Sequence, residues 1–70
     1  MAFTIHAFDK NSSASHRKSF NPSTKEKFDE CIKEFEDEVN LIFYKWYFEI
    51  DTIDATPEQE VWCDEEEKYL

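Results

Sequence analysis

The stretch Leu-Ile-Phe-Tyr-Lys-Trp-Tyr-Phe-Glu-Ile, residues 41–50, is the most aromatic part of this 70-residue chain. Half of its residues are aromatic, and such residues fit a pleated, buried surface better than a helix. The even positions from Ile42 to Ile50 are all apolar, and side chains two residues apart lie on one face of a strand. We therefore predict a long strand over residues 41–53.

A helix over residues 23–40 is predicted before this strand. Its apolar residues recur every three or four positions, which places them within about 60° of arc on one side of a helix. Ser23, with Glu26 three residues later, fits a capping box, and Asn21-Pro22 is an equally good start. A helix that continued to about residue 47 would leave large apolar side chains on its acidic side, so we end it earlier. The apolar stripe consists of Phe28, Ile32, Phe35 and Val39.

The remaining segments complete a single small domain. Residues 3–8 alternate as a strand does, whereas residues 9–22 are polar and are expected to form a mobile loop. The basic cluster His16-Arg17-Lys18 in that loop is either solvated, folded against the chain's own acids, or in contact with an acidic partner or phosphate. For residues 57–70 two interpretations stay open. Thr56-Pro57 is typical of a helix start, but two strands alone are marginally stable, which favours a third strand.

The predicted fold class is accordingly α+β. We expect the order β-α-β, with a possible further strand, and one amphipathic helix packed on a short antiparallel sheet. A C-terminal helix in place of the third strand is the alternative.

The composition argues against an enzyme. The chain has no glycine, so it has no P-loop, dinucleotide-binding loop or nucleophile elbow, each of which needs glycine at a fixed position. No set of possible ligands recurs at a metal-site spacing, so we expect no metal and no cofactor. Cys31 and Cys63 form no CxxC pair and are interpreted as thiols of a reducing compartment rather than as a disulfide. With no signal-peptide pattern and no apolar run of about 20 residues, the expected location is the cytoplasm.

The charge distribution indicates the kind of partner. The net charge is −9, and residues 28–70 carry −12 while residues 1–27 carry +3. Such a surface repels nucleic acid and anionic membranes and attracts basic surfaces. We therefore expect a basic, nucleic-acid-handling protein as the partner, with no direct nucleic-acid binding and no membrane binding.

In composition, this glycine-free, acidic chain resembles the small phage- or plasmid-encoded inhibitors that mimic nucleic acid to block restriction or CRISPR nucleases. The resemblance covers the whole chain but includes no motif, so it carries no residue roles over. It implies a non-catalytic inhibitor of a host-defence protein, acting in the host cytoplasm if phage-encoded. Acids one helical turn apart are separated by about 6 Å, a spacing of the order of phosphate steps in DNA. The predicted partner-binding residues are Glu30, Glu34, Asp37, Glu38, Glu49, Asp51, Asp54, Asp64, Glu65 and Glu66.

An interaction subunit is the alternative function. In this interpretation the chain is homodimeric or bound to a dedicated partner, as antitoxins are, and its acids serve solubility. The predicted dimer face consists of Leu41, Phe43 and Tyr47, on the odd side of the aromatic strand.

Overall fold

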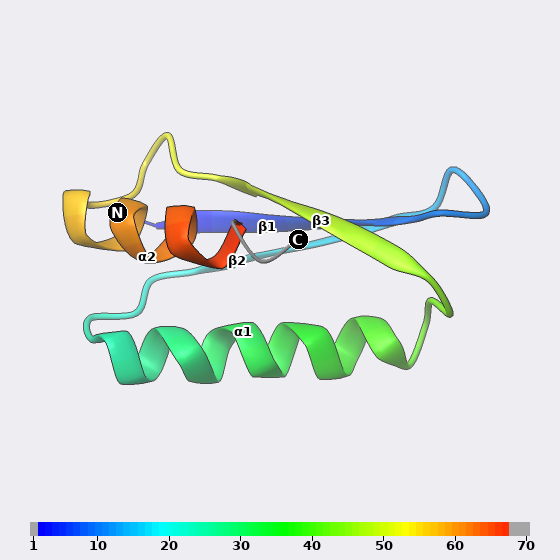
Figure 1. Ribbon diagram of the computed structural model, residues 1–70, viewed down its shortest axis with the longest axis horizontal. Helices are drawn as coiled ribbons and strands as arrows, with labels where there is room; N and C mark the ends of the chain where they lie inside the picture. The colour runs from blue at the N-terminus through cyan, green and yellow to red at the C-terminus, as the bar shows by residue number, and fades with distance from the viewer. Residues whose placement is uncertain (1, 68–70) are drawn as a thin grey trace.

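The computed structural model describes residues 2–67, which form three strands and two helices (Figure 1). The strands make one antiparallel sheet in the order β2-β1-β3, so the first strand is central. Helix α1 runs along the sheet, and α1 and α2 begin at the same end of the molecule (Figure 1). The predicted α+β class is therefore confirmed. The elements are β1 (Phe3–Asp9), β2 (Ser15–Phe20), α1 (Lys25–Asn40), β3 (Trp46–Asp51) and α2 (Pro57–Glu67).

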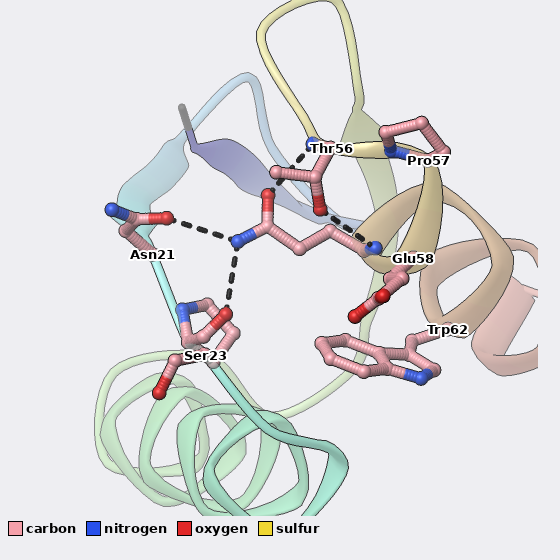
Figure 2. A pocket seen from close by; sticks show the side chains of 8 residues that line it. Asn21, Ser23, Thr56, Pro57, Glu58 and Trp62 are labelled. Carbon is pink, nitrogen blue, oxygen red and sulfur yellow. Dashed lines mark hydrogen bonds between the residues drawn. The ribbon is translucent and has the colours of Figure 1, made fainter.

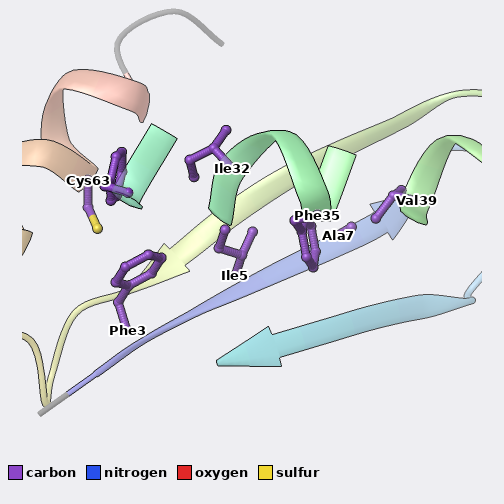
Figure 3. Packing of buried hydrophobic residues seen from close by; sticks show 8 residues of the cluster. Phe3, Ile5, Ala7, Ile32, Phe35, Val39 and Cys63 are labelled. Atoms are coloured by element: carbon purple, nitrogen blue, oxygen red, sulfur yellow. The ribbon is translucent and has the colours of Figure 1, made fainter. Parts of the chain in front are cut away.

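The core lies between the inner face of β1 and the apolar stripe of α1 (Figure 3). All four predicted stripe residues are buried, which confirms the helical period. Phe3, Ile5 and Ala7 alternate inward from β1, and Cys63 of α2 closes one end of the core. Burial of a large apolar side chain contributes about 1.5–3 kcal/mol, so these few contacts account for much of the stability of so small a domain.

Helix α1 begins one residue later than the predicted capping box. Thr24, not Ser23, is the N-cap, and its Oγ1 accepts a hydrogen bond from the Lys27 amide at 3.2 Å. The helix ends at Asn40, as predicted. The N-cap hydroxyl satisfies one of the backbone donors that the first turn leaves free, and threonine, like serine, is among the preferred residues at this position.

The prediction of a mobile loop over residues 9–22 is wrong, because residues 15–20 form β2 and pair with β1 along its length. The actual loop is short, and Asp9 closes it by accepting hydrogen bonds from the Asn11 amide and the Ser12 hydroxyl. Strand β2 was missed because it is polar. Its inward positions are His16, Lys18 and Phe20, and two of these pair with acids of α1, although the His16 ring also stacks on the core residue Phe35.

The prediction of a long strand over residues 41–53 is wrong in its extent. Strand β3 begins only at Trp46 and ends at Asp51, so it is six residues long. Residues 41–45 turn the chain from the end of α1 back to the sheet, and the Phe43 amide still bonds to the Val39 carbonyl. The turn leaves Leu41 and Tyr44 87% and 91% exposed. The alternation holds from Trp46 onward, where Trp46, Phe48 and Ile50 face the core.

The C-terminal segment is a helix, so the third-strand interpretation of residues 57–70 is wrong. Thr56 and Gln59 form the reciprocal capping box: the Gln59 amide donates to Thr56 Oγ1 at 3.1 Å, and the Thr56 amide donates to Gln59 Oε1 at 3.0 Å. Helix α2 ends at Glu67, and residues 68–70 of the predicted segment lie outside the described residues. The sheet obtains its third strand from β2 instead.

Candidate protein-binding surface

Two of the predicted partner-binding acids form ion pairs with basic residues of the same chain. Lys18 Nζ donates to Glu38 Oε1 at 2.8 Å and to Glu34 Oε1 at 3.1 Å, and His16 Nε2 lies 3.3 Å from Glu38 Oε2. These contacts lower the pKa of Glu38, first through Lys18 and then through His16. The basic cluster thus folds against the chain's own acids, as one interpretation of it predicted. Arg17 lies on the other face of β2 and is exposed.

The exposed side of α1 carries acids without such partners. Glu30 and Asp37 are exposed, and within residues 2–67 no salt bridge involves either carboxylate. Lys33 lies on the same side of the helix, three residues from Glu30 and four from Asp37, but no salt bridge joins it to either acid in the described residues, and Lys25 pairs with Asp29 at 2.9 Å. Glu30 and Asp37 therefore present unpaired carboxylates to solvent.

Helix α2 is the most acidic element. Six of its eleven residues are acids and none is basic. Gln59 and Cys63 are its buried residues, Trp62 packs its ring 5.8 Å from Phe28 of α1, and the acids occupy most of the outward side. We use the name helical acid surface for six of the exposed acids of the two helices that form no salt bridge in the described residues: Glu30, Asp37, Glu58, Glu60, Asp64 and Glu65.

Both helices end in acids and lack a basic residue in their last turn. The C-terminus of a helix carries partial negative charge, so an acid there costs about 0.3–1 kcal/mol where a lysine would gain a similar amount. Asp37 and Glu38 end α1, and residues 65–67 end α2. For Asp37 and the acids of α2, which have no salt-bridge partner in the described residues, this placement works against the stability of the helices.

Carboxylates also crowd the junction between the helices. Glu36 of α1 and Glu66 of α2 are both half-buried. Burial raises the pKa of Glu36, and the charges of Glu66 and then Asp37 raise it further. No cation pairs with Glu36 or Glu66 in the described part of the chain. A positively charged group from outside the chain would relieve this repulsion.

The other predicted acids lie elsewhere, so the ten do not form one array. Glu49 and Asp51 project from β3 on the face of the sheet opposite the core, and Asp51 accepts a hydrogen bond from the Ile53 amide. Asp54 is exposed in the connection to α2. The structure therefore places these three predicted residues away from the acids of the helices: Glu49 and Asp51 occupy odd positions of β3, and Asp54 lies in the connection that follows.

The three residues of the predicted dimer face do not lie together on one surface. Leu41 is exposed in the turn after α1, Phe43 is half-buried against the core, and Tyr47 stacks on Phe8 of β1 with ring centroids 5.2 Å apart. The three residues were assigned to one side of a strand, but residues 41–45 form no strand. The apolar residues that the turn does expose are Leu41, Ile42 and Tyr44.

A depression of about 430 Å³ lies where the two helices begin (Figure 2). The Gln59 side chain, 2% exposed, crosses it and donates to Asn21 Oδ1 at 2.9 Å and to the Pro22 carbonyl at 3.0 Å. No buried side-chain polar atom lacks a partner in the described residues, so the groups here are used in holding α2 to the segment before α1. We interpret the depression as structural.

The described residues contain no group of three histidine, cysteine or acidic side chains that could hold a metal ion. Among the same residues, no helix is long and apolar enough to cross a membrane. Comparison of the chain with protein families, with curated proteins and with solved structures finds no match.

The sequence alone did not reveal that β2 neutralises acids of α1 or that Glu36 belongs to a cluster of carboxylates. The pairing of Lys18 with Glu34 and Glu38 depends on a strand that composition did not indicate. One signal was available: His16, Lys18 and Phe20 alternate, and acids four residues apart on α1 match the two cations. Glu36 lay on the flank of the helix, and only the position of α2 identifies it as part of a carboxylate cluster.

Proposed function

We propose that this chain is a non-catalytic, protein-binding inhibitor that occupies a basic site on a DNA- or RNA-handling host-defence protein. The helical acid surface is the part that enters the site in place of nucleic acid. The observation that carries the proposal is α2, an eleven-residue helix with six acids, no base and no salt bridge among the described residues.

The energetics support a role in binding over a role in solubility alone. Solubility requires net charge but no particular placement, and it is served as well by acids near the start of a helix. Here acids also occupy the last turn of α2, the Asp37 position of α1 and the Glu36–Glu66 junction, where they reduce stability. Charges that oppose folding in this way are typical of functional sites.

The spacing of these acids suits a groove that binds nucleic acid. Glu60 and Asp64 are one helical turn apart, which is about 6 Å along the axis. Phosphates of one DNA strand advance by about 3.4 Å per nucleotide along the helix axis, so alternate phosphates are about 6.8 Å apart. Lysines and arginines spaced to bind alternate phosphates could therefore also bind carboxylates about 6 Å apart. The contacts would be charge-assisted hydrogen bonds, which are stronger than neutral ones.

Capture from a native extract tests the proposal first. The tagged chain is incubated with extract at low and at high salt, and the retained proteins are identified by mass spectrometry. We expect a basic, nucleic-acid-handling protein that is retained at low salt and released at high salt. The purified protein should then lose its DNA or RNA when the chain is added. Retention of proteins without a nucleic-acid site, insensitive to salt, would count against the proposal.

A second candidate is an antitoxin-like interaction subunit, and one observation favours it. The turn after α1 exposes Leu41, Ile42 and Tyr44 together, at 87%, 57% and 91%. Exposed apolar residues that are adjacent to one another are typical of interfaces. A Leu41→Ser/Tyr44→Ser variant that stays folded but loses a dimer in light scattering would support this function, and a monomeric wild-type chain at high concentration would exclude its homodimeric form.

A further inference from the structure

Strand β3 forms one edge of the sheet, and only half of that edge is covered. The backbone amide of Lys10 donates to the Lys45 carbonyl at 3.0 Å. Because backbone groups alternate in direction along an antiparallel strand, the odd-numbered residues of β3 direct their N–H and C=O groups towards β1. The even positions turn theirs outward, and the Ile50 amide accordingly donates to Glu67 Oε1 at 3.1 Å. Helix α2 therefore protects the Ile50 end of the strand.

The other end of the same edge is open. By the same alternation, Trp46 and Phe48 direct their N–H and C=O groups away from β1. Within residues 2–67 no strand pairs with this side, and no hydrogen bond to these outward groups is found. Unpaired groups of this kind are a template for an additional strand.

A groove of about 660 Å³ runs beside this open edge. The half-buried rings of Trp46 and Phe48 line it, Glu36 borders it on the side of α1, and Glu49 borders it on the outer face of the sheet. Lys10 is the single cation in its lining, and it forms no salt bridge with these carboxylates in the described structure. The groove is thus apolar at its base, with one carboxylate on each side and Lys10 as a single cation in its lining.

The opposite edge of the sheet is different. On β2 the outward backbone groups belong to the odd positions, and the side chains there include the exposed cation Arg17. Lys18 points to the inner side and is bound to acids of α1. Basic side chains on an edge strand discourage the addition of another strand, and they repel a basic one in particular. The two edges therefore differ in charge and in openness.

We propose that the open edge of β3 at Trp46–Phe48 binds an extended, lysine- or arginine-bearing segment of a protein partner as a fourth strand. Successive side chains of such a segment point to opposite faces of the sheet. Those on the inner face meet Glu36, and those on the outer face meet Glu49. Backbone hydrogen bonds to Phe48 provide the alignment, and the carboxylates select basic residues.

This inference rests on the proposed function for the basic character of the partner. It adds a mode of contact that the proposed function does not require, since acids on the helices could bind a basic site with no strand pairing. The two ideas can therefore fail separately.

The test uses the full chain and a synthetic eight-residue peptide of sequence Lys-Lys-Val-Val-Lys-Lys-Val-Val with blocked ends, in which neighbouring lysines point to opposite faces of the added strand. Isotope-labelled protein is titrated with this peptide, and amide hydrogen exchange is followed by NMR. We expect the Phe48 and Trp46 amides to exchange at least about tenfold more slowly when the peptide is bound, because they become hydrogen-bonded. The matched control is the same peptide with every amide N-methylated, which keeps the charge but cannot donate hydrogen bonds, and its affinity should be at least about tenfold lower.

Two protein variants separate groove binding from general charge attraction. Glu36→Gln should weaken the unmodified peptide by about three- to tenfold, whereas Asp64→Asn, on the outer side of α2, should change its affinity by less than about twofold. Binding that is indifferent to N-methylation, with perturbed amides confined to α2, would overturn strand addition and leave the proposed function intact. Failure of the unmodified peptide to bind would also overturn it.

Discussion

Glu36 of α1 and Glu66 of α2 lie together at the junction of the two helices, both half-buried, and within the described residues no cation is paired with either. A junction built for stability alone would place a cation or an apolar group there, because two like charges in partial burial repel each other. The arrangement is consistent with a surface that is completed by a positively charged partner.

Glu36→Gln is therefore expected to stabilise the free protein. Glutamine keeps the size of the side chain and removes the repulsion from Glu66 and Asp37, and we expect a gain of about 0.5 kcal/mol in the free energy of unfolding. Urea unfolding followed by tryptophan fluorescence measures it. Glu30→Gln, at an exposed position of the same helix, serves as a control and should change stability less. A clear loss of stability in Glu36→Gln would show that the carboxylate has a favourable partner.

Acidification should change stability in two opposite steps. The raised pKa of Glu36 means that the native state takes up a proton there before the unfolded chain does, so stability rises as the pH falls from neutral towards that pKa. The lowered pKa of Glu38 has the opposite sign: its contribution is present above the ordinary value of 4.5 and is lost as the pH falls through the lowered pKa. Urea unfolding between about pH 3 and pH 7 should thus show a maximum at mildly acidic pH. A steady decline from neutral pH would contradict this.

The Gln59 side chain is expected to be the most important polar group for stability. Gln59→Met keeps the shape of the side chain but leaves the Thr56 amide and the Pro22 carbonyl without their partners. A buried polar group left unsatisfied costs about 1–3 kcal/mol, so we expect a loss of about 2 kcal/mol, a large part of the stability of a domain this small. Glu58→Gln, exposed one residue away, is the control and should have little effect. Equal stability of the two variants would refute the role assigned to Gln59.

The two cysteines should differ in reactivity. The Cys63 thiol is buried in the core, and burial, together with the surrounding acids Glu67 and Asp64, raises its pKa to about 12. Burial also raises the pKa of Cys31, which is half-buried beside Glu34. Because the thiolate is the reactive form, we expect iodoacetamide at pH 8 to modify Cys31 slowly and Cys63 only when the chain unfolds. Mass spectrometry of native and denatured samples measures both rates. Equal rates in the native protein would place Cys63 outside the core.

The sequence predicted best the elements with strong local signals. The apolar residues from Phe28 to Val39 recur with a clear helical period, and a helix with a single apolar side must turn that side towards the core. The start of α1 was therefore predicted to within two residues, and its end was predicted correctly. The inner alternation of β3 was correct from Trp46 onward for the same reason. The class of the fold followed from these two elements.

Elements that depend on distant partners were not predictable in the same way. Strand β2 has a polar sequence, and it forms because β1 offers a free edge and α1 offers carboxylates to His16 and Lys18. The turn at residues 41–45 exposes apolar side chains that a burial argument assigns to a strand. The acids of the candidate surface could be listed from the sequence, but their division between the helices, the sheet and internal salt bridges required the positions of β2 and α2.

The central claim is that acids on the helices replace nucleic acid in a basic site, and competition with matched variants tests it most directly. The assay measures how much DNA or RNA the captured partner loses when wild-type chain, an α2 variant (Glu60→Gln/Asp64→Asn) or a control variant (Asp51→Asn/Asp54→Asn) is added. Both variants change the net charge equally, and the control changes acids that lie outside the helices, in β3 and in the connection to α2.

We predict that the wild-type and control chains displace the nucleic acid with similar potency, and that the α2 variant is at least about tenfold less potent, with the difference diminishing as salt is added. If the α2 variant competes as well as the control, or if the captured partner keeps its nucleic acid when saturated with wild-type chain, the claim is wrong.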